Sequence, residues 1–125
     1  MKYAFNANEK SSSRAYGSAL RISKKNSIIV CRAINRMNLG RGKRLLQDLI
    51  KQKRDIKGKY YTKTAREILE LLESAERNAE FKGLDTSNLV IHASAHKGFT
   101  FRRPRSLKRS GERRKIANIQ IVLSH

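Results

Sequence analysis

The cationic side chains between residues 97 and 115 have the chemistry of a phosphate-binding surface. This stretch holds nine Lys and Arg residues and one acid, Glu112. An arginine presents a planar fork of five N–H donors, which can grip phosphate oxygens or lie flat against a base. Because so dense and one-sided a charge rarely serves only as a solvated surface, we predict nucleic-acid contact from these cations. They are Lys97, Arg102, Arg103, Arg105, Lys108, Arg109, Arg113, Arg114 and Lys115.

Two aromatic residues lie within the same basic stretch. Phe99 and Phe101 are two positions apart, so in a strand they share one face. Exposed aromatic rings next to arginines are typical of surfaces that stack on unpaired bases. The alternative is packing of both rings against the body of the domain. We favour stacking or RNA contact because few apolar residues lie nearby in the sequence.

Two further sets of cations are candidates for RNA contact, with a solvated surface as the alternative for each. The first set lies near the N-terminus and the second in the middle of the chain. The members of the first are Arg14, Arg21, Lys24 and Lys25, and those of the second are Arg41, Lys43, Arg44, Lys57 and Lys59.

Few residues suit metal binding or catalysis. His92 and His96 fall on one face of a predicted strand, but no acid follows within ten residues, and the single cysteine, Cys31, lies in another element. We interpret the histidines as outward-facing polar residues and Cys31 as a buried, inert thiol. No glycine-rich phosphate loop, metal motif or nucleophile motif is present. The sequence therefore predicts neither an enzyme nor a metal or cofactor site.

Composition narrows the class of partner. The chain has 125 residues, with 29 Lys and Arg against 10 Asp and Glu, and a formal net charge of +19. One domain fits this length, and a charge so one-sided predicts a polyanionic partner. Nucleic acid is the first candidate and an anionic membrane the second. No apolar run approaches the roughly 20 residues that span a bilayer, and the N-terminus lacks the apolar region of a secretory signal. We expect a cytosolic protein.

The charge is unevenly distributed. Residues 63–96 carry four basic and six acidic side chains, a net charge of −2. Half of all the acids lie in this part of the chain at helical spacing: Glu67, Glu70, Glu73, Glu76 and Glu80. Because carboxylates repel phosphate, this helix should face solvent or a basic protein neighbour.

Apolar periodicity predicts three helices after a short strand at residues 15–22. We expect residues 1–13 to form an extended arm. The first helix starts after Ser23, a possible N-cap, with a stripe of Val30, Ala33, Ile34 and Met37. A break at 38–42 precedes a shorter second helix that ends near residue 52. After a basic loop at 53–59, Thr62 is a possible cap for the third and longest helix, whose stripe is Ala65, Ile68, Leu69, Leu72, Ala75 and Ala79.

Two period-two segments predict paired strands near the C-terminus. Residues 89–96 and 118–123 alternate between apolar and polar positions, so each strand should bury one face. Pairing Leu89 with Leu123 in a hairpin places the turn near residue 106. Residues 97–115 then form an arm on the order of 30 Å long beyond the core. A two-stranded ribbon of this kind is marginal alone, so its order must come from a partner.

Several segments resemble the universal large-subunit ribosomal protein twenty-two family, in its archaeal and eukaryotic branch. The most specific is ESAERNAEFKGLDTSNLVIHASAHKG, residues 73–98. Shorter matches are RIS-KK at residues 21–25, RPR at 103–105 and IQIVL at 119–123. The resemblance implies an α+β domain of three helices on a small antiparallel sheet, with a long protruding basic β-hairpin. It also implies that the hairpin tip, taken as Arg103, Pro104, Arg105, Ser106, Leu107 and Lys108, lines the peptide exit tunnel.

We therefore expect residues 14–125 to form a single RNA-binding domain that is a structural constituent of the large ribosomal subunit. The partners this implies are large-subunit ribosomal RNA, neighbouring ribosomal proteins and the nascent polypeptide, with no membrane and no homo-oligomer. A free-standing basic chaperone of RNA or DNA is the alternative. A membrane-active protein is disfavoured because the arm has no wide apolar face.

Overall fold

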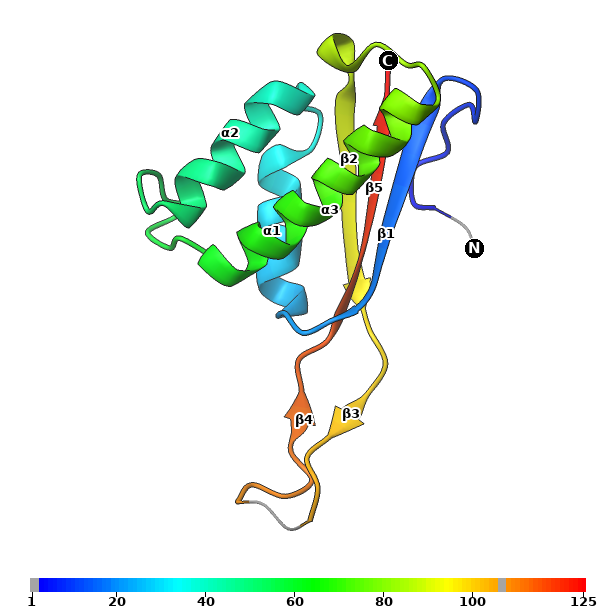
Figure 1. Ribbon diagram of the computed structural model, residues 1–125. Coiled ribbons are helices and arrows are strands. Elements are labelled where there is room, and N and C mark those ends of the chain that lie inside the picture. The colour runs from blue at the N-terminus through cyan, green and yellow to red at the C-terminus, as the bar shows by residue number, and fades with distance from the viewer. Residues whose placement is uncertain (1–2, 106–107) are drawn as a thin grey trace.

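The computed structural model describes residues 3–105 and 108–125. It shows an α+β fold in which three helices accompany a small antiparallel sheet, which confirms the predicted class (Figure 1). In chain order the elements are β1 (Ser12–Leu20), α1 (Lys24–Ile34), α2 (Leu39–Ile50), α3 (Thr62–Phe81), a 3-10 turn η1 (Thr86–Asn88), β2 (Val90–Lys97), β3 (Phe101–Arg102), β4 (Arg113–Arg114) and β5 (Ala117–Ser124).

The main sheet has three strands in the order β1-β5-β2, with both pairs antiparallel. Ile91 pairs with Leu123, so the predicted partnership of Leu89 with Leu123 is wrong by two residues. A two-residue shift keeps every side chain on the same face, and apolar alternation therefore cannot detect it. Leu89 instead precedes the strand, where its carbonyl accepts the Leu39 N–H at 2.9 Å.

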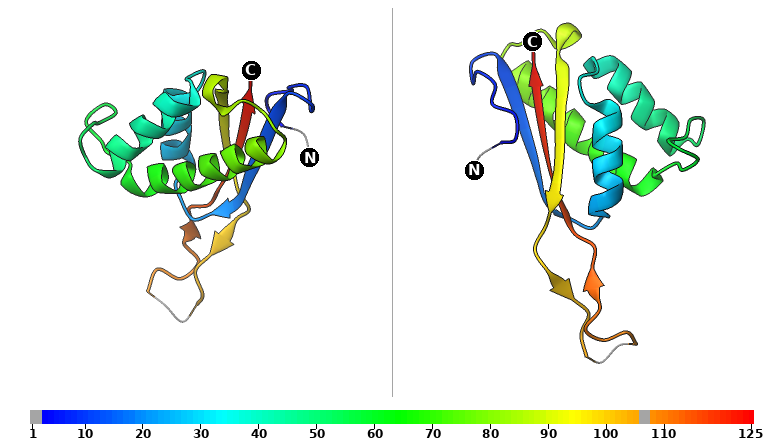
Figure 2. Two further views of the ribbon diagram at one scale, coloured as in Figure 1. Left: turned by 45° about the horizontal axis from the view of Figure 1, so that its top comes forward. Right: turned by 180° about the vertical axis from the view of Figure 1, so that it is seen from behind.

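The hydrophobic core lies between the helices and one face of this sheet. Ile68 and Leu72 of α3 are fully buried against the sheet, whose own buried side chains on this face include Ile91, Ile119 and Ile121. Burial of each such side chain contributes about 1.5–3 kcal/mol. Figure 2 shows α3 crossing the sheet, with α1 beside β2.

The first strand begins earlier than the sequence indicates. Ser12 and Ser13, assigned to the N-terminal arm, are fully buried in β1. Their hydroxyls are satisfied, because Ser13 Oγ donates to the carbonyl of Ala75 at 2.8 Å and Ser12 Oγ to that of Asn8 at 2.7 Å. Buried serines with partners of this kind leave no apolar signal, so the boundary at residue 13 is wrong.

The N-terminal segment, residues 3–11, covers the other face of the sheet (Figure 2). The Ala4 N–H donates to Gln120 Oε1 at 3.0 Å, and the Phe5 ring stacks on His92 with centroids 3.7 Å apart. As a result, β5 is buried on both faces: Gln120 and Val122 are buried on one face, and the apolar side chains are buried on the other. The expectation that each strand buries one face is therefore wrong for β5, because it ignored this cover.

The start of α2 corrects a predicted break. Residues 38–42 were expected to interrupt the helices, whereas α2 begins at Leu39 with Asn38 as its N-cap. Asn38 Oδ1 accepts the Gly40 N–H at 3.2 Å, a typical capping bond. The glycines that suggested a break lie inside the helix, and α1 correspondingly ends at Ile34, before Met37.

Gly42 allows α2 to approach β2 closely, and its replacement by alanine should destabilise the fold. A Cβ at this buried position would lie 2.4 Å from Ile91 Cδ1, so Ile91 must move within a packed core. We expect Gly42→Ala to lower the free energy of unfolding by about 1–3 kcal/mol in urea denaturation. Gly40→Ala is the matched control, because a Cβ there meets nothing within 4 Å and alanine favours the helix. Equal effects of the two changes would contradict this role.

The third helix confirms the longest predicted apolar stripe. Of the six stripe residues, all but Leu69 are fully buried. Thr62 is the first residue of the helix rather than its cap, which is Tyr61 in a left-handed conformation. At the other end Gly83 has a φ of +72°, and the N–H groups of Gly83 and Leu84 donate to the carbonyls of Glu80 and Ala79. This Schellman motif ends the helix where the sequence indicates.

The basic hairpin leaves the body of the domain, as predicted (Figure 1). Strands β3 and β4 pair only with each other, through Phe101 with Arg114 and Arg102 with Arg113. At the base, the Gly98 N–H donates to the Ile116 carbonyl at 3.1 Å. We call residues 99–115 the hairpin arm. Of the proposed tip residues, Ser106 and Leu107 lie outside the described residues.

Candidate nucleic-acid interface

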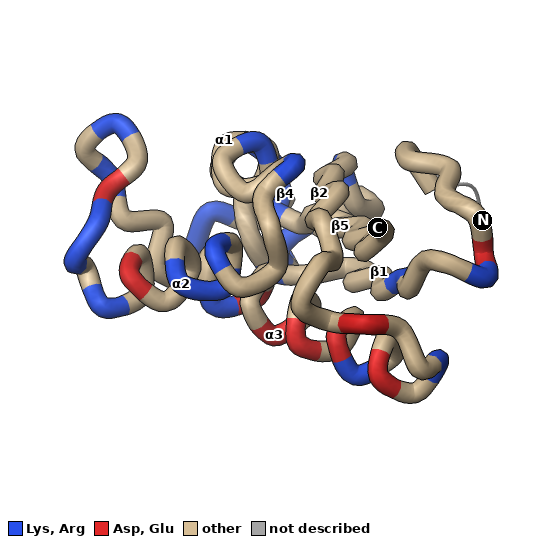
Figure 3. The backbone as a smooth tube through the Cα atoms, turned by 90° about the horizontal axis from the view of Figure 1, so that it is seen from above, with Lys and Arg blue, Asp and Glu red and all other residues tan. Residues whose placement is uncertain are grey.

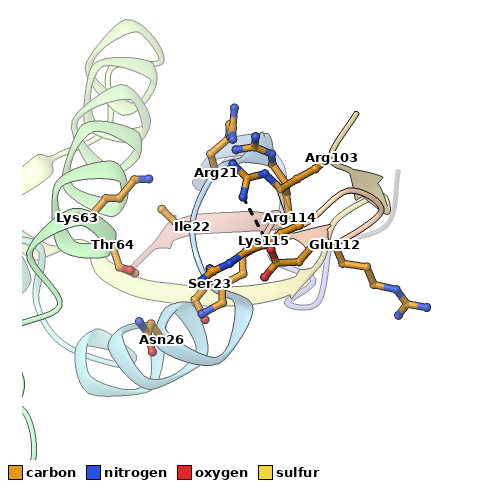
Figure 4. A pocket seen from close by; sticks show the side chains of 12 residues that line it. Arg21, Ile22, Ser23, Asn26, Lys63, Thr64, Arg103, Glu112, Arg114 and Lys115 are labelled. Atoms are coloured by element: carbon orange, nitrogen blue, oxygen red, sulfur yellow. Dashed lines mark ion pairs between the residues drawn. The ribbon is translucent and has the colours of Figure 1, made fainter. Parts of the chain in front are cut away.

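A basic groove of about 480 Å³ lies where the hairpin arm meets the body. Figure 4 shows Lys63 reaching it from α3, Arg21 from the connection after β1, and Arg103 and Arg114 from the arm. Arg109, Arg113 and Lys115 also line it, and Glu112 is its one acid. The fold thus brings cations of the N-terminal set together with those of the arm. Lys63 is in neither predicted set, because a single lysine in the first turn of a helix carries no signal of its own.

Buried neighbours fix the two body residues of the groove. Ile22, next to Arg21, is 3% exposed, and its N–H donates to the Leu20 carbonyl at 2.9 Å. Thr64, next to Lys63, is 4% exposed. Arg21 and Lys63 themselves are exposed. The backbone is therefore anchored while both charges remain free to meet a ligand.

The guanidinium groups of the arm are held mainly by the arm itself. Arg102 Nη1 donates to the Gly111 carbonyl at 3.0 Å, and Arg103 lies 3.9 Å from a carboxylate oxygen of Glu112. The Nε atoms of Arg103 and Arg114 are buried and have no hydrogen-bond partner among the described residues. A buried donor without a partner costs about 1–3 kcal/mol, so a rotation of either side chain that lets its Nε meet a bound acceptor would be stabilising.

Phe99 and Phe101 form a pair at the surface of the arm. Their rings meet edge to face with centroids 6.3 Å apart, and they are 59% and 41% exposed. Neither ring belongs to the hydrophobic core. The predicted alternative, packing against the body, is therefore wrong. The exposed rings remain available for stacking on a base.

Acidic and basic side chains occupy different parts of the surface. Figure 3 shows the acidic positions concentrated along α3, with basic positions on α1, α2 and the loop between α2 and α3. Only one of the five glutamates of α3, Glu76, forms an ion pair within the described residues. The body therefore presents phosphate-attracting surfaces that are separate from a phosphate-repelling helix.

Comparison with known proteins identifies the family. The family model for ribosomal protein L22p/L17e matches residues 15–124. The chain belongs to this family. Among curated relatives, it is 32% identical to large ribosomal subunit protein uL22 of Methanocaldococcus jannaschii, over 98% of this chain and 94% of the relative. It is 34% identical to the protein of that name from Methanococcus aeolicus, over 98% and 95%. With that from Archaeoglobus fulgidus, it shares 32% identity over 98% and 94%.

Arg14 is separated from the rest of its predicted set in this L22p/L17e family member. Its guanidinium lies 3.4 Å from Glu9, donates to the Ala7 carbonyl at 3.2 Å and sits over the Tyr3 ring. These contacts tie Arg14 to the N-terminal segment. Lys24 and Lys25 are exposed at the start of α1. Of the four predicted residues, only Arg21 lines the groove.

The second predicted set lies on α2 and the loop that follows it. Arg41 and Arg44 line a hollow with Arg54, which the prediction omitted although it lies in the predicted basic loop. Lys57 and Lys59 are exposed in the same loop. The structure thus divides this set between a helix face and a loop.

Lys43 differs from its neighbours on α2, and substitution should reveal the difference. Its Nζ donates to Glu76 Oε2 at 2.7 Å, and both side chains are about three-quarters buried. We expect Lys43→Gln to leave the salt dependence of RNA binding nearly unchanged. Arg44→Gln, at an exposed position on the same helix, should reduce the log–log salt slope by about 1, because one phosphate contact is lost. Equal slopes for both variants in fluorescence anisotropy titrations would contradict this assignment.

The two predicted outward-facing histidines have different surroundings. Burial lowers the pKa of His92 below its ordinary value, and the Arg36 guanidinium lowers that pKa further. His96 is exposed. Burial also raises the pKa of the Cys31 thiol to about 12, which agrees with an inert thiol. In the described ranges, no group of three His, Cys, Asp or Glu side chains could hold a metal ion, and no helix could cross a membrane.

The lowered pKa of His92 should make stability depend on pH. The folded state favours the neutral ring, so unfolded chains bind more protons between the lowered pKa and the ordinary value of 6.5. The free energy of unfolding should therefore decrease as the pH falls from about 7 to 5. His92→Gln should flatten this decrease in urea melts at several pH values. His96→Gln is the control and should preserve it. An unchanged pH dependence in His92→Gln would refute the link.

Proposed function

We propose that this protein is a structural constituent of the large ribosomal subunit that binds large-subunit ribosomal RNA. The observation that carries the proposal is the hairpin arm, which leaves the body and holds eight cations against one acid. None of its described residues belongs to the hydrophobic core. The family match supports the proposal, because the matched relatives are named as large-subunit proteins. Membership of this family implies a cytoplasmic location within the subunit and a structural rather than enzymatic role.

RNA binding would use separate surfaces. The arm and the groove would contact one region of RNA, and the arginines and loop lysines near α2 would contact another. Phosphate contacts would supply most of the affinity, while Phe99 and Phe101 would stack on unpaired bases. Lys97, at the end of β2, would extend the basic surface toward the base of the arm. RNA segments that would otherwise repel one another would thereby be held together.

We assign the far end of the arm to the wall of the peptide exit tunnel. Among its described residues, Arg105 and Lys108 are exposed cations on either side of the undescribed positions. Pro104, also exposed, restricts the backbone just before them. The nascent polypeptide would pass these side chains. The acidic face of α3 would instead meet solvent or a basic neighbouring protein, and no self-association is required.

Subunit purification and RNA competition test the ribosomal role. A tagged full-length chain should co-sediment with large subunits at moderate salt. In vitro, it should retain a labelled large-subunit ribosomal RNA fragment against an excess of bulk RNA. Absence from the subunit, together with equal binding to any RNA, would favour a free-standing RNA or DNA chaperone.

Photo-cross-linking tests the tunnel assignment separately. A photoreactive residue at position 105 should cross-link to a nascent chain stalled on purified ribosomes. The same residue at position 10, in the exposed part of the N-terminal segment, is the control and should not cross-link. Cross-linking at neither position would remove the tunnel assignment while leaving RNA binding intact.

A further inference from the structure

We propose that the basic groove clamps a single RNA backbone between the arm and the body, and that this clamped strand fixes the direction of the arm. The inference rests on the proposed RNA-binding function and adds to it a site and a mechanical consequence. The ligand class is a single-stranded phosphodiester segment of one or two nucleotides. The groove volume, about 480 Å³, is in the range of small-ligand pockets of roughly 300–1,000 Å³ and suits a short segment of one strand.

Polar bonds do not fix the arm to the body. Within the described parts of the chain, all hydrogen bonds and ion pairs of residues 99–115 have both partners inside the arm. The last bond before the arm is the one from Gly98 to Ile116. A two-stranded ribbon joined to a body only at its base can swing about that base. No hydrogen bond or ion pair of the described residues therefore sets the direction of the arm.

The two walls of the groove repel each other in the absence of a ligand. The body wall contributes Arg21 and Lys63, and the arm wall contributes five cations and Glu112. Like charges within about 10 Å of one another interact strongly, because screening by salt is incomplete at that distance. A phosphodiester strand in the groove reverses this effect, since each wall attracts the same phosphates. The ligand that neutralises the groove would therefore also draw the arm toward the body.

Unused donors in the groove match the acceptors of a phosphate backbone. The buried Nε atoms of Arg103 and Arg114 have no hydrogen-bond partner among the described residues, and the contact of Arg103 with Glu112 is long at 3.9 Å. Phosphate oxygens accept charge-assisted bonds from guanidinium groups at shorter distances, about 2.7–2.9 Å. A bound phosphate could thus satisfy donors that the arm leaves open, and it could displace Glu112 without loss of a strong pair.

Distances between two spin labels, measured by double electron–electron resonance, test the clamp in the full-length chain. Spin labels at Ser74→Cys on α3 and Ser110→Cys in the arm report the direction of the arm, since both positions are exposed. The native Cys31 is buried and should not take up label. The probe is a 12-nucleotide oligouridylate. The inter-label distance distribution should be broad without RNA and become narrow when the oligonucleotide is bound.

Matched double variants separate the clamp from RNA binding in general. Arg21→Gln with Lys63→Gln removes the body wall, while Lys10→Gln with Arg77→Gln removes equal charge from exposed positions outside the groove. The inter-label distance distribution of the control variant should become narrow when RNA binds, as that of the parent chain does. The groove variant should still bind through other surfaces, with a log–log salt slope reduced by about 1.4, but its inter-label distance distribution should stay broad.

Each other outcome rejects a defined part of the inference. A narrow distribution without RNA, or narrowing that persists in the groove variant, would overturn the clamp and leave the proposed RNA-binding function intact. Failure of the parent chain to bind either the oligouridylate or ribosomal RNA would overturn both.

Discussion

The affinity of this protein for a large-subunit ribosomal RNA fragment should fall by roughly 10⁵-fold between about 50 and 200 mM monovalent salt. If its surfaces together neutralise about ten phosphates, the log–log slope of the association constant against salt is near −9. Each cation that meets a phosphate releases condensed counterions, and added salt opposes that release. Fluorescence anisotropy titrations at five or more salt concentrations would measure the slope.

Variants of the α2 surface distinguish simultaneous use of the surfaces from the use of one. The arm and the groove together carry ten cations, so the parent slope alone does not show whether the α2 surface is engaged. A combined variant, Arg41→Gln with Arg44→Gln, should shift the parent slope by about 2 only if the α2 surface is engaged as well. A parent slope no steeper than about −4 would contradict binding by several surfaces at once.

The helices could be predicted from the sequence because their buried faces repeat at the helical period. Ala65, Ile68, Leu72, Ala75 and Ala79 lie on one side of α3, and the packing of the sheet there requires that spacing. The predicted end at Lys82 and Gly83 also agrees, because only a residue tolerant of positive φ suits that position. Local pattern and tertiary packing point to the same structure in this helix.

Other boundaries depend on contacts between distant parts of the chain. Gly42 reads as a helix breaker, yet it lies inside α2 because only a residue without a Cβ fits against Ile91. Ser13 reads as part of a polar arm, yet the Ala75 carbonyl accepts its hydroxyl in the core. In both cases the decisive neighbour is nearly fifty or more residues away. No local pattern contains that information.

The candidate site, too, could be predicted from the sequence only in part. Composition finds the cations, but it does not show that Arg21, Lys63 and Arg114 meet in one groove. Nor does it show that Arg14 and Lys43 are already engaged, by Glu9 and Glu76. Arg14 and Arg21 lie close in sequence, but an irregularity of β1 between Gly17 and Leu20 intervenes. Charge density predicts a class of partner, whereas the fold decides which charges act together.

Deletion of residues 99–111 should leave a folded domain that has lost most of its RNA affinity. No described residue in this segment belongs to the hydrophobic core, so the unfolding free energy should change by no more than about 1 kcal/mol. Residues 112–115 would then connect Gly98 to Ile116, a four-residue loop that suits a β-hairpin. The helical circular dichroism signal and a single cooperative melt should be retained.

The loss of affinity should be large because the deletion removes five cations: Arg102, Arg103, Arg105, Lys108 and Arg109. The log–log salt slope should fall in magnitude by up to about 4.5, and affinity at low salt should drop by at least a hundredfold, at about 1.4 kcal/mol for each factor of ten. A full-length variant with the same five residues changed to glutamine is the matched control. It should reproduce the change in slope while keeping the Phe99 and Phe101 rings.

Comparison of these two variants separates charge from the arm itself. If bases stack on the two rings, the glutamine variant should bind more tightly than the deletion by roughly 1–3 kcal/mol per stacked base. Equal affinities would show that the rings contribute nothing beyond the charges. A deletion variant without helical signal would mean instead that the arm supports the core, contrary to the placement of every buried side chain among the described residues. The melt is therefore measured before the affinity, since only a folded deletion can report on the arm.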